Sequence, residues 1–358
     1  MKFLVNFSLL LCQTALFAQS ENTPPALSFS GYAETYYLYD FGNPLDHNRP
    51  NFVYAFNRHN EVNLNLGFVK AAYAKDKVRA NLALMAGTYA NANLAAEPGV
   101  LRNVLEANVG VKIAKSKNLW IDAGIFGSHI GFESAISKDC CNLTRSIMAE
   151  NSPYYESGIK IGYTSNNGKW FISGLLLNGW QRIQRVNGNN TPAFGHQLTY
   201  KPNDKVTLNS SSFIGNDKPD TLRQMRYFHD LYGSFQLSPK VSLMAGFDFG
   251  AEQKAKGSSE YNTWYTPVIM ARFVASNKVS IAVRGEYYQD PNGVIIATGT
   301  RNGFRTMSFS ANLDYAIQDN ILWRIEARGF RSKDAIFTQD GIASKDNFLL
   351  ATSLAISF

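Results

Sequence analysis

The chain has 358 residues, of which 18% are charged and 13% are aromatic, and its formal net charge is +7. Lys and Arg occur singly among Asp and Glu and form no basic block, which argues against nucleic-acid binding. The apolar runs fall short of the roughly eighteen residues that a transmembrane helix needs. Many aromatic residues without long apolar runs are typical of a barrel that meets lipid on one side and water on the other.

The N-terminus predicts a secretory signal peptide. Lys2 precedes an apolar stretch from Phe3 to Leu11, and a signal peptidase could cleave after Ala18. An N-terminal membrane anchor is the alternative, but the apolar stretch is too short for one and the next segment is polar. We therefore expect a signal peptide over residues 1–18 and a short N-terminal segment over residues 19–26.

Alternation of apolar and polar residues dominates the rest of the chain. In the clearest segment, 104–113, one face carries Leu105, Ala107, Val109, Val111 and Ile113 and the other carries Glu106, Asn108, Gly110 and Lys112. This period of two is that of a β-strand with one apolar and one wet face. The same pattern recurs at 62–68, 78–84, 241–249, 279–287, 307–315 and 321–328.

Two kinds of connection separate these segments. Short polar turns lie at 75–77, 115–118, 166–169, 202–204, 238–240, 276–278 and 318–320. Longer polar stretches lie near 40–58, 90–103, 127–153, 179–193, 215–226, 252–261, 289–303 and 331–346. Seven turns and eight loops imply sixteen strands, and about 340 mature residues suit that number of membrane strands. We predict an all-β fold, in which residues 27–358 form one transmembrane up-and-down antiparallel β-barrel with long extracellular loops and short periplasmic turns.

The alternation leaves the strand geometry of two segments unassigned. The stretch from Trp170 to Leu177 is apolar on both faces, so alternation does not tell which face points inward. Pro267 lies inside a predicted strand, where it cannot donate a ladder hydrogen bond, so we expect a β-bulge there.

The last strand alternates from Phe348 and ends the chain on the aromatic Phe358. Resemblance to outer-membrane proteins generally implies that the barrel-assembly machinery reads such a strand, so Phe358 is a candidate assembly signal. Together with the signal peptide, this strand predicts a location in the bacterial outer membrane.

A family resemblance rests on the longest loop. The segment Gly131-Phe132-Glu133-Ser134 and the segment from Leu143 to Gly158 resemble the OmpL-like β-barrel porin type 2 family. In porins generally the third loop folds into the barrel and narrows it. By that resemblance Glu133, Arg145 and Glu150 are candidates to line a constriction; the alternative is that each merely packs the loop against the wall.

Parity along the strands predicts which charged side chains face the lumen, if the apolar face meets lipid. The candidates are Arg79, Lys112, Asp122, Glu156, Arg284, Glu286, Asp314, Arg324, Glu326 and Arg328, with Glu34, Glu106, Lys160 and Asp248 in addition. Positive and negative charges nearly cancel in this set, so no strong ion selectivity follows. Arg284, Arg324 and Arg328 could favour anions, or they could pair with acids on neighbouring strands.

These features predict a porin-like channel for passive diffusion of small hydrophilic solutes; a closed barrel acting as adhesin or surface receptor is the alternative. An enzyme is not expected, because the five histidines (His47, His59, His129, His196 and His229) fall singly and Ser128 lacks the flanking pattern of a nucleophile. Cys140 and Cys141 are adjacent, so a disulfide between them could not link distant parts of the fold. We expect no metal and no other cofactor. Expected partners are outer-membrane lipid, the assembly machinery and small solutes, and the resemblance to porins adds a homo-oligomer.

Overall fold

The computed structural model describes residues 26–358. The predicted signal peptide and residues 19–25 of the short N-terminal segment lie outside this range. Within residues 26–358, the helices are all too short or too polar to cross a membrane.

Strands make up most of the described chain, and helical turns are confined to loops. The strands are β1 (Leu27–Asp40), β2 (Val62–Lys75), β3 (Val78–Ala86), β4 (Val104–Lys112), β5 (Asn118–Gly127), β6 (Tyr155–Thr164), β7 (Trp170–Leu177), β8 (Ala193–Asn203), β9 (Val206–Gly215), β10 (Arg226–Gln236), β11 (Val241–Gln253), β12 (Tyr261–Val274), β13 (Val279–Asp290), β14 (Phe304–Gln318), β15 (Ile321–Ser332), β16 (Phe337–Gln339), β17 (Ile342–Ser344) and β18 (Asp346–Ser357). The helical elements are α1 (Thr88–Asn93), α2 (Ile147–Glu150), η1 (Gly99–Asn103), η2 (Ser137–Asp139) and η3 (Asp220–Leu222).

Strands β1 to β15 and β18 form one closed antiparallel barrel, in which each strand pairs with its sequence neighbours and β18 pairs with β1. Strands β16 and β17 form a separate hairpin in the last long loop. Closure leaves no free sheet edge, as a membrane barrel requires, because lipid cannot hydrogen bond to the backbone. The sixteen-strand barrel that the alternation predicts is confirmed.

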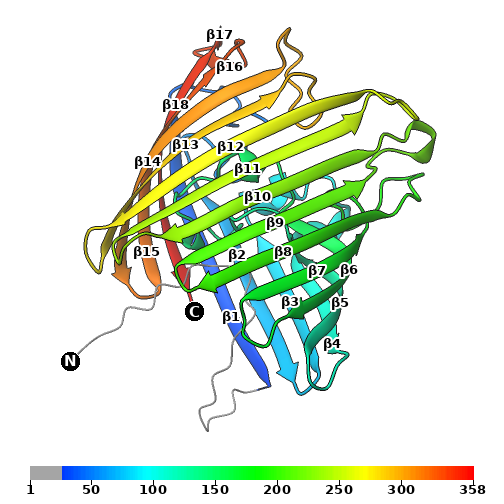
Figure 1. The fold of residues 1–358 in the computed structure, drawn as a ribbon. Helices are drawn as coiled ribbons and strands as arrows, with labels where there is room; N and C mark the ends of the chain where they lie inside the picture. Colours follow the sequence, from blue (N-terminus) through cyan, green and yellow to red (C-terminus); the bar gives the residue numbers. More distant parts are fainter. Residues whose placement is uncertain (1–25) are drawn as a thin grey trace.

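Long loops and short turns gather at opposite ends of the barrel (Figure 1). The two ends of the barrel sheet, the start of β1 and the end of β18, both lie at the short-turn end (Figure 1). This arrangement places the loops 41–61, 87–103, 128–154 and 178–192 next to one another at the other end.

The alternation predicted from sequence sorts the side chains into two environments. On β4, Val109 and Val111 project outward and are 61% and 50% exposed, whereas Glu106 and Lys112 point to the interior and are less exposed. The structure also settles β7: Ile172 and Leu176 face outward, and Leu175 and Leu177 are buried inside. Exposed apolar side chains on the outer wall form the surface that meets lipid.

The bulge predicted at Pro267 is wrong. Strand β12 runs without a break from Tyr261 to Val274, and its pairing with β11 keeps one register through Phe247 and Pro267. On the other side the pairs Tyr265 with Gln289 and Val268 with Glu286 belong to one register as well. Proline therefore weakens the ladder to β13 locally, since it has no N–H to donate, without inserting an extra residue.

Candidate functional site

The loop of residues 128–154, between β5 and β6, folds into the barrel. His129 starts it: its Nδ1 is 2.7 Å from Glu156 Oε2 on β6, and its Nε2 is 2.8 Å from the Ser212 carbonyl oxygen on β9. The Ser211 hydroxyl donates to the His129 carbonyl over 2.7 Å. Burial alone would lower the pKa of His129, but the Glu156 carboxylate beside it raises the pKa above its usual value. These contacts tie the loop to strands that lie several positions apart in the wall.

The middle of the loop is bonded to the strands β13 to β15. Backbone N–H groups of the loop donate to side chains of the wall: Leu143 to Asn312 Oδ1 over 3.0 Å, Thr144 to Glu326 Oε2 over 2.6 Å and Ile147 to Glu286 Oε2 over 2.6 Å. Because β5 and β6, where the loop begins and ends, lie far around the barrel from β13 to β15, the loop crosses the interior.

Three arginines of this wall donate back to the carbonyl groups of the loop. Arg284 Nη1 donates to Thr144 O over 2.7 Å, and Arg328 Nη1 donates to Arg145 O over 2.7 Å. Arg324 Nη2 donates to Cys140 O and Cys141 O over 3.0 and 3.1 Å. The loop is thus fastened through charged donors and acceptors on both sides of its backbone.

The same arginines pair with carboxylates of their own wall. Arg324 Nε is 2.7 Å from Asp314 Oδ1, Arg328 Nη2 is 2.6 Å from Glu286 Oε1, and Arg284 Nη2 is 3.1 Å from Glu326 Oε1. These side chains are at most 3% exposed. Arg284, Arg324 and Arg328 therefore pair with acidic residues on neighbouring strands, which is the second of the two alternatives that the sequence offered for them.

The three constriction candidates lie on this loop, but their charged groups contact protein. Glu133 accepts hydrogen bonds from the backbone N–H and the hydroxyl of Ser146. Arg145, which is 0% exposed, donates to the carbonyl groups of Ser134, Leu143 and Ala135. Glu133 and Arg145 therefore stabilise the conformation of the loop itself. Other residues form the surface that faces the remaining lumen.

Glu150, at the end of α2, joins this loop to the first long loop. Its carboxylate accepts from the backbone N–H of Tyr54 over 2.9 Å and of Ala55 over 3.3 Å. Burial raises the pKa of Glu150 to about 7, although these N–H groups and Arg145 favour the charged form. Burial likewise raises the pKa of Glu133.

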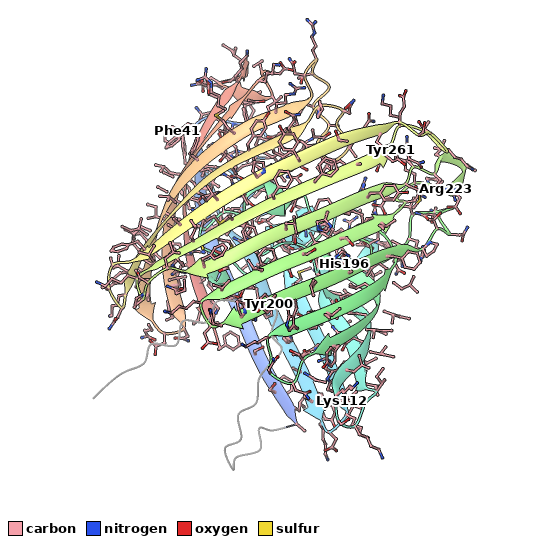
Figure 2. All side chains as sticks on the ribbon, viewed as in Figure 1. Phe41, Lys112, His196, Tyr200, Arg223 and Tyr261 are labelled. Atoms are coloured by element: carbon pink, nitrogen blue, oxygen red, sulfur yellow. The ribbon has the colours of Figure 1, made fainter. Side chains whose placement is uncertain are left out.

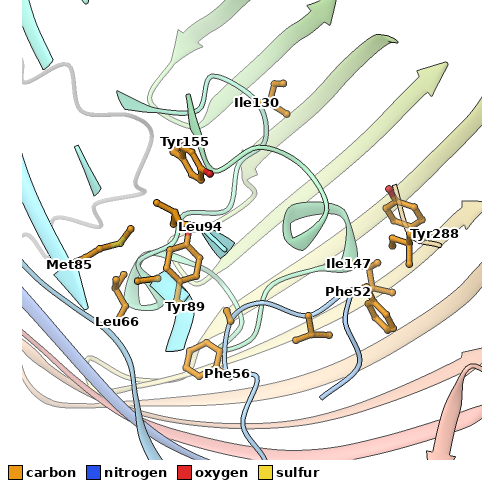
Figure 3. Packing of buried hydrophobic residues seen from close by; sticks show 14 of the residues in the cluster. Phe52, Phe56, Leu66, Met85, Tyr89, Leu94, Ile130, Ile147, Tyr155 and Tyr288 are labelled. Atoms are coloured by element: carbon orange, nitrogen blue, oxygen red, sulfur yellow. The ribbon is translucent and has the colours of Figure 1, made fainter. Parts of the chain in front are cut away.

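Two further loops join the same assembly. Glu97, in the loop 87–103, accepts from the Tyr155 hydroxyl over 3.2 Å and from the Ile183 backbone N–H over 2.8 Å. Apolar side chains from several loops and strands then pack together, among them Phe52, Ile147 and Tyr288, as Figure 3 shows. This shared packing was not predicted from the sequence. The feature that could have indicated it is the presence of large apolar residues within long stretches that otherwise have the polar composition of loops.

A more open part of the interior lies toward the short turns, on β3 to β6. Arg79 forms two hydrogen bonds to Asp122, of 2.6 and 2.7 Å, and its guanidinium lies over the Trp120 ring. The Arg79 side chain is 33% exposed. Lys112, near the short-turn end in Figure 2, is partly exposed as well. The structure thus brings Arg79 together with Asp122, and it separates them from the arginines on β13 and β15.

Phe358 closes the barrel seam. Its backbone N–H donates to Gly31 O over 3.0 Å, and Gly31 N–H donates to Phe358 O over 2.8 Å. The ring lies directly over Gly31, where a Cβ would be 2.3 Å from the ring atom Cζ. The terminal aromatic is therefore part of the β1–β18 seam, and its role as an assembly signal stays a prediction.

Comparisons with known proteins agree with this architecture. The family described as "Putative beta-barrel porin-2, OmpL-like" matches residues 26–358. No curated protein has a significantly similar sequence.

Solved structures share the fold at low identity. An anion-selective porin from Comamonas acidovorans superposes with a TM-score of 0.62 at 8% identity, covering 93% of this chain and 99% of that one. Outer-membrane expressed OmpT of Vibrio cholerae gives 0.60 at 9% identity, covering 94% and 99%. Salmonella typhi OmpF, solved with daunomycin, gives 0.60 at 11% identity, covering 93% and 97%.

Proposed function

This chain belongs to the OmpL-like family of β-barrel porins in the bacterial outer membrane, and on that premise we propose that it is a channel through which small hydrophilic solutes diffuse passively. The observation that carries the proposal is the loop 128–154, which enters the barrel and is bonded to β13, β14 and β15 across the interior. A lumen narrowed by a fastened loop restricts passage by size.

The inner wall supports passage of polar solutes. Arg79 and Lys112 present charged groups to the more open part of the interior, and the buried Asp122 pairs with Arg79. Because Arg79 and Asp122 are paired, the field they produce is small, and we expect only modest discrimination between cations and anions.

The contacts among the loops favour a second candidate, a closed barrel that acts as an adhesin or receptor. Loops 41–61, 87–103, 128–154 and 178–192 are joined by Glu97 and Glu150 and share apolar packing. If this packing seals the mouth, no solute passes.

Conductance in a planar lipid bilayer separates the two functions. The folded protein should give stepwise conductance, and replacing residues 132–148 by a short Gly/Ser linker should raise the single-channel conductance several-fold. Electrical silence of the wild-type protein at all voltages, with conductance in the linker variant, would establish the closed barrel instead. Equal conductance of both proteins would show that the loop does not narrow the passage.

A further inference from the structure

The outer wall of the barrel carries a polar island among the side chains that face lipid. Outward positions on three neighbouring strands hold His196 on β8, Ser210 and Ser212 on β9, and His229 on β10. His196 and His229 both lie opposite Ser212 in the strand register. We define these four residues as the outer-wall island.

The island is internally hydrogen bonded. The Ser212 hydroxyl lies 2.5 Å from His196 Nδ1, and the Ser210 hydroxyl lies 3.1 Å from His229 Nε2. The two imidazole rings are 5.8 Å apart between centroids. Each ring has a second nitrogen, His196 Nε2 and His229 Nδ1, for which the described residues 26–358 supply no hydrogen bond.

The island lies a few residues from the long-loop end of its strands, with exposed apolar side chains on both sides of it. Toward the long loops it is bordered by Phe194, Ile214 and Tyr227, and toward the short turns by Leu198, Leu208 and Leu231, all exposed on the outer wall. Figure 2 shows His196 part-way along the wall, between Tyr200 near the short turns and Arg223 in a long loop. Hydrocarbon chains at this depth have no donor or acceptor, so polar groups left against them are unfavourable.

We propose that the outer-wall island is an interface with a second copy of this chain. All copies insert in the same orientation and to the same depth, so a rotation about an axis normal to the membrane brings island against island at one height. Imidazole and hydroxyl groups both donate and accept, so the island is complementary to itself. The exposed apolar side chains around it pack against their counterparts in the other copy. The proposal rests on the outer-membrane location and not on conduction.

Cross-linking in native membranes tests the contact. In the Ser212→Cys variant, oxidation should link two copies through a disulfide, because Ser212 lies at the centre of the island, between His196 and His229, and so faces its own counterpart across a two-fold axis. Cys140 and Cys141 lie on the inward-folded loop and cannot meet those of another barrel. The matched control is Leu350→Cys, because Leu350 also faces outward a few residues from the long-loop end of its strand, but lies on β18 across the barrel. A linked dimer for Ser212→Cys alone supports the proposal; links in both variants or in neither overturn it.

Oligomer mass in a mild detergent provides an independent measurement. Replacing the island by apolar residues (His196→Leu, Ser210→Ala, Ser212→Ala and His229→Leu) should raise the oligomer dissociation constant at least ten-fold while the barrel stays folded. Thr352→Val is the control: Thr352 faces outward on β18, and its hydroxyl is already bonded to Trp323 Nε1 and Arg324 O. A monomeric wild-type protein, or equal dissociation of both variants, would contradict the proposal. Conductance per barrel tests the channel separately.

Discussion

Arg324 should hold the inward-folded loop in place, so Arg324→Met should release it locally. The substitution removes the hydrogen bonds to the carbonyl groups of Ser137, Cys140 and Cys141 and the ion pair with Asp314. Breaking a buried ion pair by removing one partner costs about 3–5 kcal/mol. Since about 1.4 kcal/mol corresponds to a factor of ten, opening of the loop should become about 10²- to 4 × 10³-fold more favourable.

Amide hydrogen exchange in lipid nanodiscs measures this opening. Protection of the amides between residues 137 and 143 should fall by that factor, and protection of the barrel strands should stay. The control is Arg331→Met on the same strand, because Arg331 is 72% exposed and its ion pair with Asp346 is 3.7 Å long. In Arg324→Met, Asp314 keeps its ion pair with Arg272 over 3.3 Å. The double variant Arg324→Met with Asp314→Asn also removes the Asp314 charge and should still expose the loop. Unchanged protection in both Arg324 variants would refute the fastening role.

Three further outcomes follow from the site. The pKa of Glu150 is raised by burial to about 7, so the folded state binds this proton more tightly than the unfolded chain. The contact with the first loop should therefore be most stable below about pH 4.5 and lose stability as the pH rises through 7. Glu150→Gln should abolish this pH dependence of the protection factors, which are measured by hydrogen exchange relative to the intrinsic rate at each pH. Arg79→Glu should shift the reversal potential in a salt gradient toward cation selectivity more than Arg223→Glu, because Arg223 lies on the exposed rim, where salt screens its charge; equal shifts would place Arg79 outside the passage. Deleting Phe358 should impair outer-membrane assembly and leave export intact, measured by fractionation and heat modifiability, whereas normal assembly would remove the signal assigned to it.

For the charged residues, the sequence predicted only which face of a strand each side chain lies on, and not which groups it contacts. Parity on β13 and β15 assigns Arg284 and Arg328 to the interior, and the structure has both there. Parity does not tell that Glu286 accepts from Arg328 and from the backbone of Ile147, because those contacts depend on strand register and on the path of a loop about 140 residues away. Glu150 meets Tyr54 for the same long-range reason.

The sequence by itself determined the barrel. Alternation with a period of two, the two kinds of connection and the final aromatic strand are local properties, since a strand that separates lipid from water must alternate wherever it lies in the wall. The strand number follows from counting such segments.

Only the tertiary structure decided which face of β7 is inner, that Pro267 leaves the register of β12 unchanged, and that four loops share one packed interior. It also brought together His196 and His229, which are far apart in the sequence. The physical reason is that register and loop packing are set by the sum of many contacts between distant segments, which no short stretch of sequence contains.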